Sequence, residues 1–169
     1  IIREEQRIRI IRELVDRLQM EVEDEAEFTA SVLSEISMVK GEIMSLDHYY
    51  SKNCPEEMFK KLYRGYEEAL AGKGLLDFDD MLAMCYELFT ARRDILAAWQ
   101  QKYRYILIDE FQDINRVQYE IVRMLAAPEN NLFIVGDDDQ SIYRFRGARP
   151  EIMLGFEKDY PQTKRVLLG

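Results

Sequence analysis

Apolar positions recur at helical intervals through the first half of the chain. Within residues 1–24 the apolar side chains fall three, four or seven positions apart, with Arg and Glu between them: Ile1, Ile8, Ile11, Leu14, Val15 and Leu18. This spacing predicts an amphipathic helix. A second helix is predicted over 25–43 with a stop at Gly41, and a third over 54–74, which starts with acidic residues after Pro55 and ends at glycines. The first half is therefore predicted to be a helical bundle with solvated charged faces.

Three aspartates precede the apolar positions of the next predicted helix. They are Asp77, Asp79 and Asp80. Carboxylates at a helix start satisfy free backbone N–H groups and complement the helix dipole. Capping is the simplest account of this cluster.

From residue 103 onward, short apolar runs alternate with amphipathic stretches. Strands are predicted at 105–108, within 131–139 and at 164–168, and helices at 115–126 and 149–160. The strands are continuously apolar rather than alternating, which is typical of a parallel sheet covered on both faces. The second half is therefore predicted to be of the α/β class.

Composition narrows the functional classes. The 169 residues, 47% of them hydrophobic, suit one domain or one domain with an insertion. No apolar run approaches the ~20 residues of a membrane span, and Cys54, Cys85 and His48 are too isolated for a zinc site or disulfide framework. A cytoplasmic location is expected. The net charge of -9 argues against a general grip on nucleic-acid backbones but allows a local basic patch. Because the chain begins with Ile1, we expect a piece of a longer protein.

Both acidic clusters of the second half follow predicted strands. Asp109 and Glu110 follow the first strand, and the aspartates at 137–139 follow the second. In parallel sheets, ligands bind at the carboxyl ends of strands. An apolar strand that ends in Asp-Glu resembles the Walker B element of P-loop nucleotide hydrolases, in which the aspartate helps hold Mg²⁺ and the next carboxylate orients or deprotonates water. The short motif alone leaves two interpretations open, which are strand-end solvation and half of a metal-nucleotide site.

The second strand end carries further polar and aromatic residues. In "VGDDDQSIYRFRGA", at 135–148, Gln140 lies close enough to the acidic edge to hydrogen-bond a phosphate oxygen. Tyr143 and Phe145 then alternate with arginines that include Arg146. Rings stack on bases at about 1–3 kcal/mol each, and Arg neutralises phosphate, so the segment suits single-stranded nucleic acid. The alternative is that both rings belong to the core and that the arginines cover a helix start.

Together these segments resemble a known family. "DEFQD" at 109–113 and the segment at 135–148 resemble motifs II and III of the UvrD/Rep-type (superfamily 1) DNA helicases. "LDFDDML" at 76–82 is similar to the segment that precedes motif II, and "FEKDYPQTKRVLL" at 156–168 to the stretch that leads to the next motif. The first half resembles, more weakly, the subdomain inserted into the first motor domain, most readily at 36–43.

The resemblance implies a two-part organisation. Residues 1–75 would form the helical inserted subdomain, and residues 76–169 the C-terminal portion of the RecA-like ATPase motor domain. The fold class is then α/β, with an incomplete P-loop NTPase-type parallel sheet beside an all-helical subdomain.

The resemblance also implies roles and ligands. Asp109 would assist Mg²⁺ coordination, Glu110 would activate the hydrolytic water, and Gln140 would sense the γ-phosphate of ATP and link it to the DNA track. Tyr143 and Phe145 would line the path of single-stranded DNA.

Arg146 would support that loop or its phosphate contacts. The sequence departs from the family at Phe145, where well-known members have Trp and a larger stacking surface.

One element of a complete motor is not found in the sequence. The nearest match to a G-x-x-x-x-G-K-[ST] phosphate loop is "GYEEALAGKG" at 65–74, in which the glycines are too far apart and Lys73 is followed by Gly74. We therefore expect a fragment of an ATP-dependent DNA helicase of repair or replication, inactive alone and completed by the remainder of the helicase chain. Two alternatives stay open. One is a piece of a helicase-nuclease subunit, and the other is a non-catalytic module that binds single-stranded DNA or protein.

Overall fold

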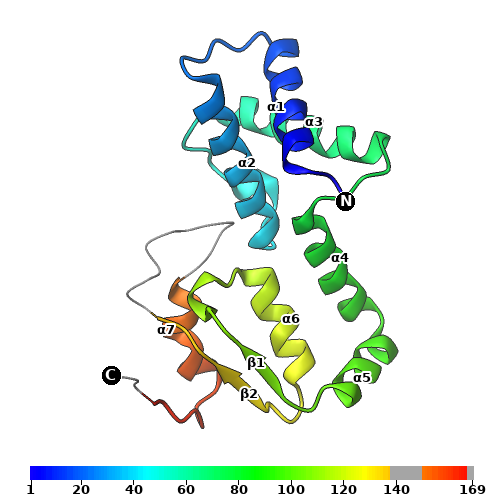
Figure 1. Cartoon of the computed structure of the whole chain (residues 1–169), viewed down its shortest axis with the longest axis vertical. Helices are drawn as coiled ribbons and strands as arrows, with labels where there is room; N and C mark the ends of the chain where they lie inside the picture. The colour runs from blue at the N-terminus through cyan, green and yellow to red at the C-terminus, as the bar shows by residue number, and fades with distance from the viewer. Residues whose placement is uncertain (138–149, 167–169) are drawn as a thin grey trace.

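A computed structural model describes residues 1–137 and 150–166 of the chain (Figure 1). In chain order the elements are α1 (Glu4–Arg17), α2 (Glu25–Gly41), η1 (Leu46–His48), α3 (Glu56–Gly72), α4 (Phe78–Ala91), α5 (Arg93–Lys102), β1 (Ile106–Ile108), η2 (Phe111–Asp113), α6 (Arg116–Ala126), β2 (Leu132–Ile134) and α7 (Pro150–Asp159). Figure 1 shows α1, α2 and α3 gathered at one end of the molecule, the strands with α6 and α7 at the other, and α4 running between them.

The first hydrophobic core lies within α1, α2 and α3. Its fully or nearly buried side chains come from the periodic positions of these helices and include Ile11, Val32, Ile36, Leu62 and Tyr66. The predicted helical bundle is confirmed. The predicted stop of the third helix is also confirmed, because α3 ends at Gly72 and Gly74 adopts a left-handed φ of 61°.

The second core lies on one face of a two-stranded parallel sheet. The strands pair in the register Ile106↔Leu132, Leu107↔Phe133 and Ile108↔Ile134. The residues buried against them come from η2, α6 and α7 and the segments next to them: Phe111, Ile114, Tyr119, Ile152 and Phe156. The chain is thus mostly helical, and the small parallel sheet in its second half agrees with the predicted α/β class.

Two predictions about the sheet need correction. Cover on both faces was expected, yet Leu107 is 73% exposed and Phe133 is 60% exposed. Within the described residues, helices cover only the other face, so the apolar runs fill one face and leave the other open to solvent. In the predicted third strand, residues 164–166 have no strand conformation, and 167 and 168 lie outside the described residues.

A buried cluster of charges joins the bundle to the start of α4. The ammonium of Lys40, on α2, lies 2.6 Å from a carboxylate oxygen of Glu67, 2.8 Å from one of Asp77 and 2.7 Å from one of Asp80. The side chains of Lys40 and Asp77 are only 5% and 1% exposed. Burial alone would raise the pKa of Asp77, but the nearby Lys40 and several hydrogen bonds outweigh it and lower that pKa.

Asp79 belongs to the same helix start but has a different environment. Its carboxylate accepts a 2.6 Å hydrogen bond from the Ser37 hydroxyl, and burial raises its pKa. The capping prediction holds for Asp77, whose side chain accepts from the backbone N–H of Asp80 at 2.7 Å. It did not anticipate that these aspartates also bind residues of α2.

The end of α2 lies directly against the start of α6. A Cβ placed on Gly41 would lie 2.9 Å from Nδ2 of Asn115, so the glycine permits this approach. Asn115 is buried and caps α6 by accepting a 2.9 Å hydrogen bond from the N–H of Gln118. The bundle and the sheet layer are therefore in direct contact.

The cysteines, the histidine and the helices have the following positions and lengths. Cys54 and Cys85 are free thiols, and His48 lies on the surface at the end of η1. Across the part of the chain that the structure describes, no helix has the length and apolar character needed to span a bilayer.

Candidate functional site

The ends of the two strands are held together beyond the sheet itself. The N–H of Val135 donates to the Ile108 carbonyl at 2.8 Å, and the N–H of Phe111 donates to the Val135 carbonyl at 2.9 Å. Asp109 and Glu110, which lie between these bonds in the chain, are both exposed. The structure thus places the two adjacent carboxylates at the carboxyl end of β1, beside the chain that leaves β2.

Glu110 has an unusual backbone conformation. Its φ of 50° and ψ of 41° are left-handed, and its N–H donates to Oδ1 of Asp109 at 2.9 Å. For a residue other than glycine this conformation costs roughly 1–2 kcal/mol. The fully buried Phe111 offsets that cost, because its ring packs edge-on against Tyr119 and Phe156 with centroids 5.9 and 5.6 Å away. The carboxylate pair therefore rests on a firmly anchored turn.

Gln112 connects this turn with the other strand end. Its Nε2 donates to Oε2 of Glu110 at 2.5 Å, and its Oε1 accepts from the N–H of Asp137 at 3.0 Å. The side chain is buried, with 2% exposed. Gly136 allows the approach, because a Cβ there would lie 2.8 Å from Oε1 of Gln112 and 3.2 Å from Sδ of Met153.

The donor set at β1 fits a hard divalent cation that is shared with a phosphate ligand. Among residues 1–137 and 150–166, no three His, Cys, Asp or Glu side chains gather closely enough to hold a metal by themselves. Mg²⁺ is commonly held by one or two carboxylates together with substrate phosphates, and two exposed carboxylates on a fixed turn meet that requirement.

A hydrogen bond between α6 and α7 fixes Tyr119, whose ring packs against Phe111 of the anchored turn. The Tyr119 hydroxyl donates to Oδ2 of Asp159 at 2.6 Å, and burial followed by this carboxylate raises the Tyr119 pKa. The hydroxyl therefore stays protonated and donates at neutral pH.

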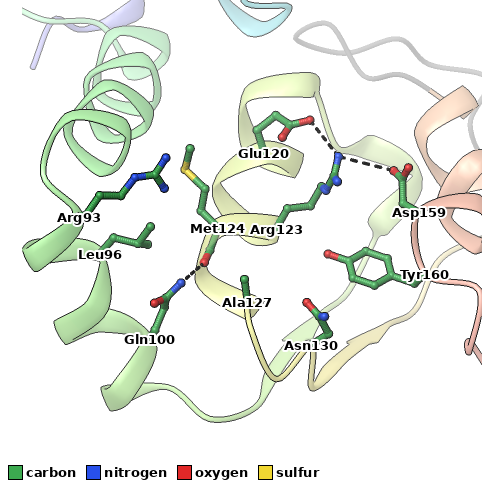
Figure 2. A pocket seen from close by; sticks show the side chains of 10 residues that line it. All are labelled: Arg93, Leu96, Gln100, Glu120, Arg123, Met124, Ala127, Asn130, Asp159 and Tyr160. Atoms are coloured by element: carbon green, nitrogen blue, oxygen red, sulfur yellow. Dashed lines mark hydrogen bonds and ion pairs between the residues drawn. The ribbon is translucent and has the colours of Figure 1, made fainter.

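A cavity of about 390 Å³ lies among α5, α6 and α7 (Figure 2). It is lined by residues of α5, α6, the turn after α6, the end of α7 and Tyr160, and neither Asp109 nor Glu110 contributes to it. Three of its charged groups lie close together, since Arg123 is 3.6 Å from Glu120 and 3.9 Å from Asp159. Because neither carboxylate of the strand end lines it, this cavity is not the candidate site.

The remaining predicted site residues lie outside the described residues. They are Gln140, Tyr143, Phe145 and Arg146, together with the acidic pair at 138–139. Their predicted roles stay predictions.

Fold and site define an α/β protein with a large helical part and an acidic pair at a parallel strand end. The sequence profile described as UvrD/REP helicase N-terminal domain matches residues 1–161, and the chain belongs to that family. The resemblance read from the sequence is confirmed.

Individual relatives agree with this assignment. The chain is 55% identical to YjcD of Bacillus subtilis (strain 168) over 113 residues, which are 67% of this chain and 15% of YjcD. It is 39% identical to the ATP-dependent DNA helicase PcrA of Leuconostoc citreum over 140 residues, which are 82% of this chain and 19% of PcrA. The chain therefore spans less than a fifth of the length of these relatives.

The contacts of Gln112 and Lys40 are what the sequence interpretation missed. Gln112 lies within "DEFQD" and Lys40 within 36–43, and neither contact was predicted. The available signal for Lys40 was weak. Lys40 is the only basic residue in 36–43, so it was the only candidate there for an ion pair with the aspartates at 77–80.

Proposed function

We propose that the chain supplies the magnesium-and-water side of the ATP site of an ATP-dependent DNA helicase. The observation that most supports this is the placement of Asp109 and Glu110 side by side on an anchored turn at the carboxyl end of β1. Family membership and the PcrA relatives, whose names state ATP-dependent DNA helicase activity, give independent support.

The proposed organisation has two parts. Residues 1–75 act as the helical inserted subdomain, and residues 76–169 belong to a RecA-like motor domain with a P-loop-type sheet. The open face of the sheet around Leu107 and Phe133 then packs against the remainder of the helicase chain. Large exposed apolar side chains on a strand pair support this, because such patches commonly mark contact surfaces.

The proposed chemistry is hydrolysis of ATP. Asp109 would help hold Mg²⁺, which neutralises charge on the phosphates when bound. Glu110 orients a water molecule and accepts its proton as the water oxygen bonds to the γ-phosphorus and the bond to the leaving ADP oxygen breaks. The left-handed turn fixes the backbone that carries the Glu110 carboxylate.

DNA contact is assigned to the segment that follows the second strand. Gln140 is proposed to contact the γ-phosphate, Tyr143 and Phe145 to stack on bases of single-stranded DNA, and Arg146 to neutralise backbone phosphate. With a net charge of -9, the chain offers no general attraction to DNA, so binding depends on these local residues. A cytoplasmic role in DNA repair or replication follows from this proposal.

The 169-residue chain by itself is proposed not to turn over ATP. The nearest match to a phosphate-binding loop, at 65–74, is the end of α3 and its left-handed stop. Its backbone N–H groups bond within that stop, for example Leu75 to the Leu70 carbonyl at 3.0 Å, and do not form a cradle for phosphate.

The test uses the full-length protein that carries this chain. Glu110→Gln is expected to lower the turnover of ATP stimulated by single-stranded DNA by about 10²–10⁴-fold, while ATP binding is retained. The control is Glu129→Gln, because Glu129 is an exposed turn residue remote in sequence from the acidic pair. Wild-type turnover in Glu110→Gln overturns the proposal. If the full-length protein turns over no ATP but binds single-stranded DNA, and Tyr143→Ala and Phe145→Ala abolish that binding while Glu110→Gln does not, the result favours a non-catalytic binding module.

A further inference from the structure

Gln112 is the only described side chain for which hydrogen bonds to both strand ends are found. Its amide has one donating and one accepting end, and each is used on a different strand end. The donating end holds the Glu110 carboxylate, and the accepting end holds the backbone N–H of Asp137.

The surroundings leave Gln112 little freedom. The residue before it, Phe111, is fully buried in the second core, and Gln112 itself is 2% exposed. On the far side, the close approach of Gly136 confines Oε1. The exposed Glu110 side chain, by contrast, has three rotatable bonds and would sample many orientations without a partner. An amide donor fixes such a carboxylate without placing a positive charge beside it.

We infer that Gln112 is a positioning residue that sets the orientation of the Glu110 carboxylate and ties it to the backbone at the end of β2. Any displacement of the chain at Asp137 is then transmitted through one rigid amide to Glu110. This inference rests on the proposed role of Glu110 in water activation. It adds a residue that acts through Glu110 and touches neither water nor nucleotide.

The central experiment is Gln112→Glu in the full-length protein. This substitution keeps an oxygen that can accept from the Asp137 N–H but replaces the donor to Glu110 by a second carboxylate. We expect kcat for ATP to fall roughly 10²-fold, the effect of misplacing a catalytic group by about 1 Å. KM for ATP and the Kd for single-stranded DNA should stay unchanged. Gln112→Met repeats the test without a buried charge, and thermal unfolding checks that each variant folds.

A double-mutant cycle with Glu110→Gln separates positioning from general structure. If Gln112 acts through Glu110, then Gln112→Glu should lower kcat by less than twofold further once Glu110 has been replaced. Equal losses of kcat in both backgrounds, or a rise in KM that accounts for the loss, overturn the inference. The control is Gln118→Glu, because the Gln118 side chain also accepts a backbone N–H, that of Asn115 at 3.0 Å, but donates to no carboxylate in the described residues.

The outcomes also separate this inference from the proposal on which it rests. Wild-type ATP turnover in Glu110→Gln refutes the proposed function itself. Loss of activity in Glu110→Gln together with wild-type kcat in both Gln112 variants refutes only the positioning role.

Discussion

Replacing Lys40 by Met should release the bundle from the start of α4. Lys40 is the only cation found within ion-pair distance of Asp77 and Asp80 among the described residues, and those side chains are 1% and 17% exposed. The Glu67 side chain is 41% exposed, but the Oε1 that faces Lys40 is buried, and burial raises the pKa of its carboxyl. Removing one partner of a buried ion pair costs about 3–5 kcal/mol, because the remaining charges stay buried without compensation.

Hydrogen exchange of the α2 amides measures this loss. A cost of about 3–5 kcal/mol raises exchange through bundle opening by roughly 10²–10⁴-fold. Lys60→Met is the matched control, because Lys60 also lies 2.6 Å from a carboxylate, that of Glu56, but its acidic neighbours Glu56, Asp47 and Glu57 are 39%, 70% and 83% exposed and stay solvated without it. Its exchange should not change beyond measurement error.

A third variant identifies the cause. Adding Asp77→Asn and Asp80→Asn to Lys40→Met removes the uncompensated charges, while asparagine still caps the helix. This triple variant should recover much of the lost protection. The reasoning is refuted if Lys40→Met changes exchange no more than Lys60→Met does, or if the triple variant is less protected than Lys40→Met alone.

Other substitutions give equally definite expectations. Asp77 has a lowered pKa in the folded protein, so its carboxylate stabilises the fold above about pH 3.8. This contribution is lost as the pH falls further. Asp77→Asn should therefore lower the midpoint of urea unfolding at pH 7 and make that midpoint less dependent on acid pH. Asp79 has a raised pKa, so its ionised form opposes folding at neutral pH. Asp79→Asn should therefore raise or preserve the midpoint of urea unfolding at pH 7. A clear decrease of that midpoint would contradict the buried environment of Asp79. Gly65→Ala should destabilise the protein by about 1–3 kcal/mol, because the added Cβ would lie 2.6 Å from Cδ2 of Leu14. Gly72→Ala, at a helical position with no neighbour within 4 Å, should instead stabilise it by about 0.5–1 kcal/mol in the same chemical denaturation assay.

Much of the fold follows from local sequence signals. The starts of α4 and α6 coincide with capping residues, Asp77 and Asn115, and the end of α3 with its glycines. These signals act over three or four residues, so the sequence reveals them directly. The break between α4 and α5 at Arg92 has no Pro or Gly to announce it, and the sequence did not predict it.

Some features of the candidate site also follow from the sequence, and others do not. The placement of Asp109 and Glu110 follows from the rule that parallel strands end at one edge of a sheet. The partners of Lys40 lie 27 to 40 positions away in the chain, and Gln112 meets Asp137 across 25 positions. Such contacts depend on how helices and strands pack, which periodicity along the chain does not determine.

The close approach of Gly41 and Asn115 has a consequence for recombination between relatives. A chimera that joins residues 1–75 of one family member to residues 76–169 of another separates these two positions into different parental sequences. A donor with any side chain at position 41 would bring it within 2.9 Å of the Asn115 amide and so disturb the cap of α6. Functional chimeras should therefore be found chiefly among parents that share glycine at position 41, whatever their overall identity.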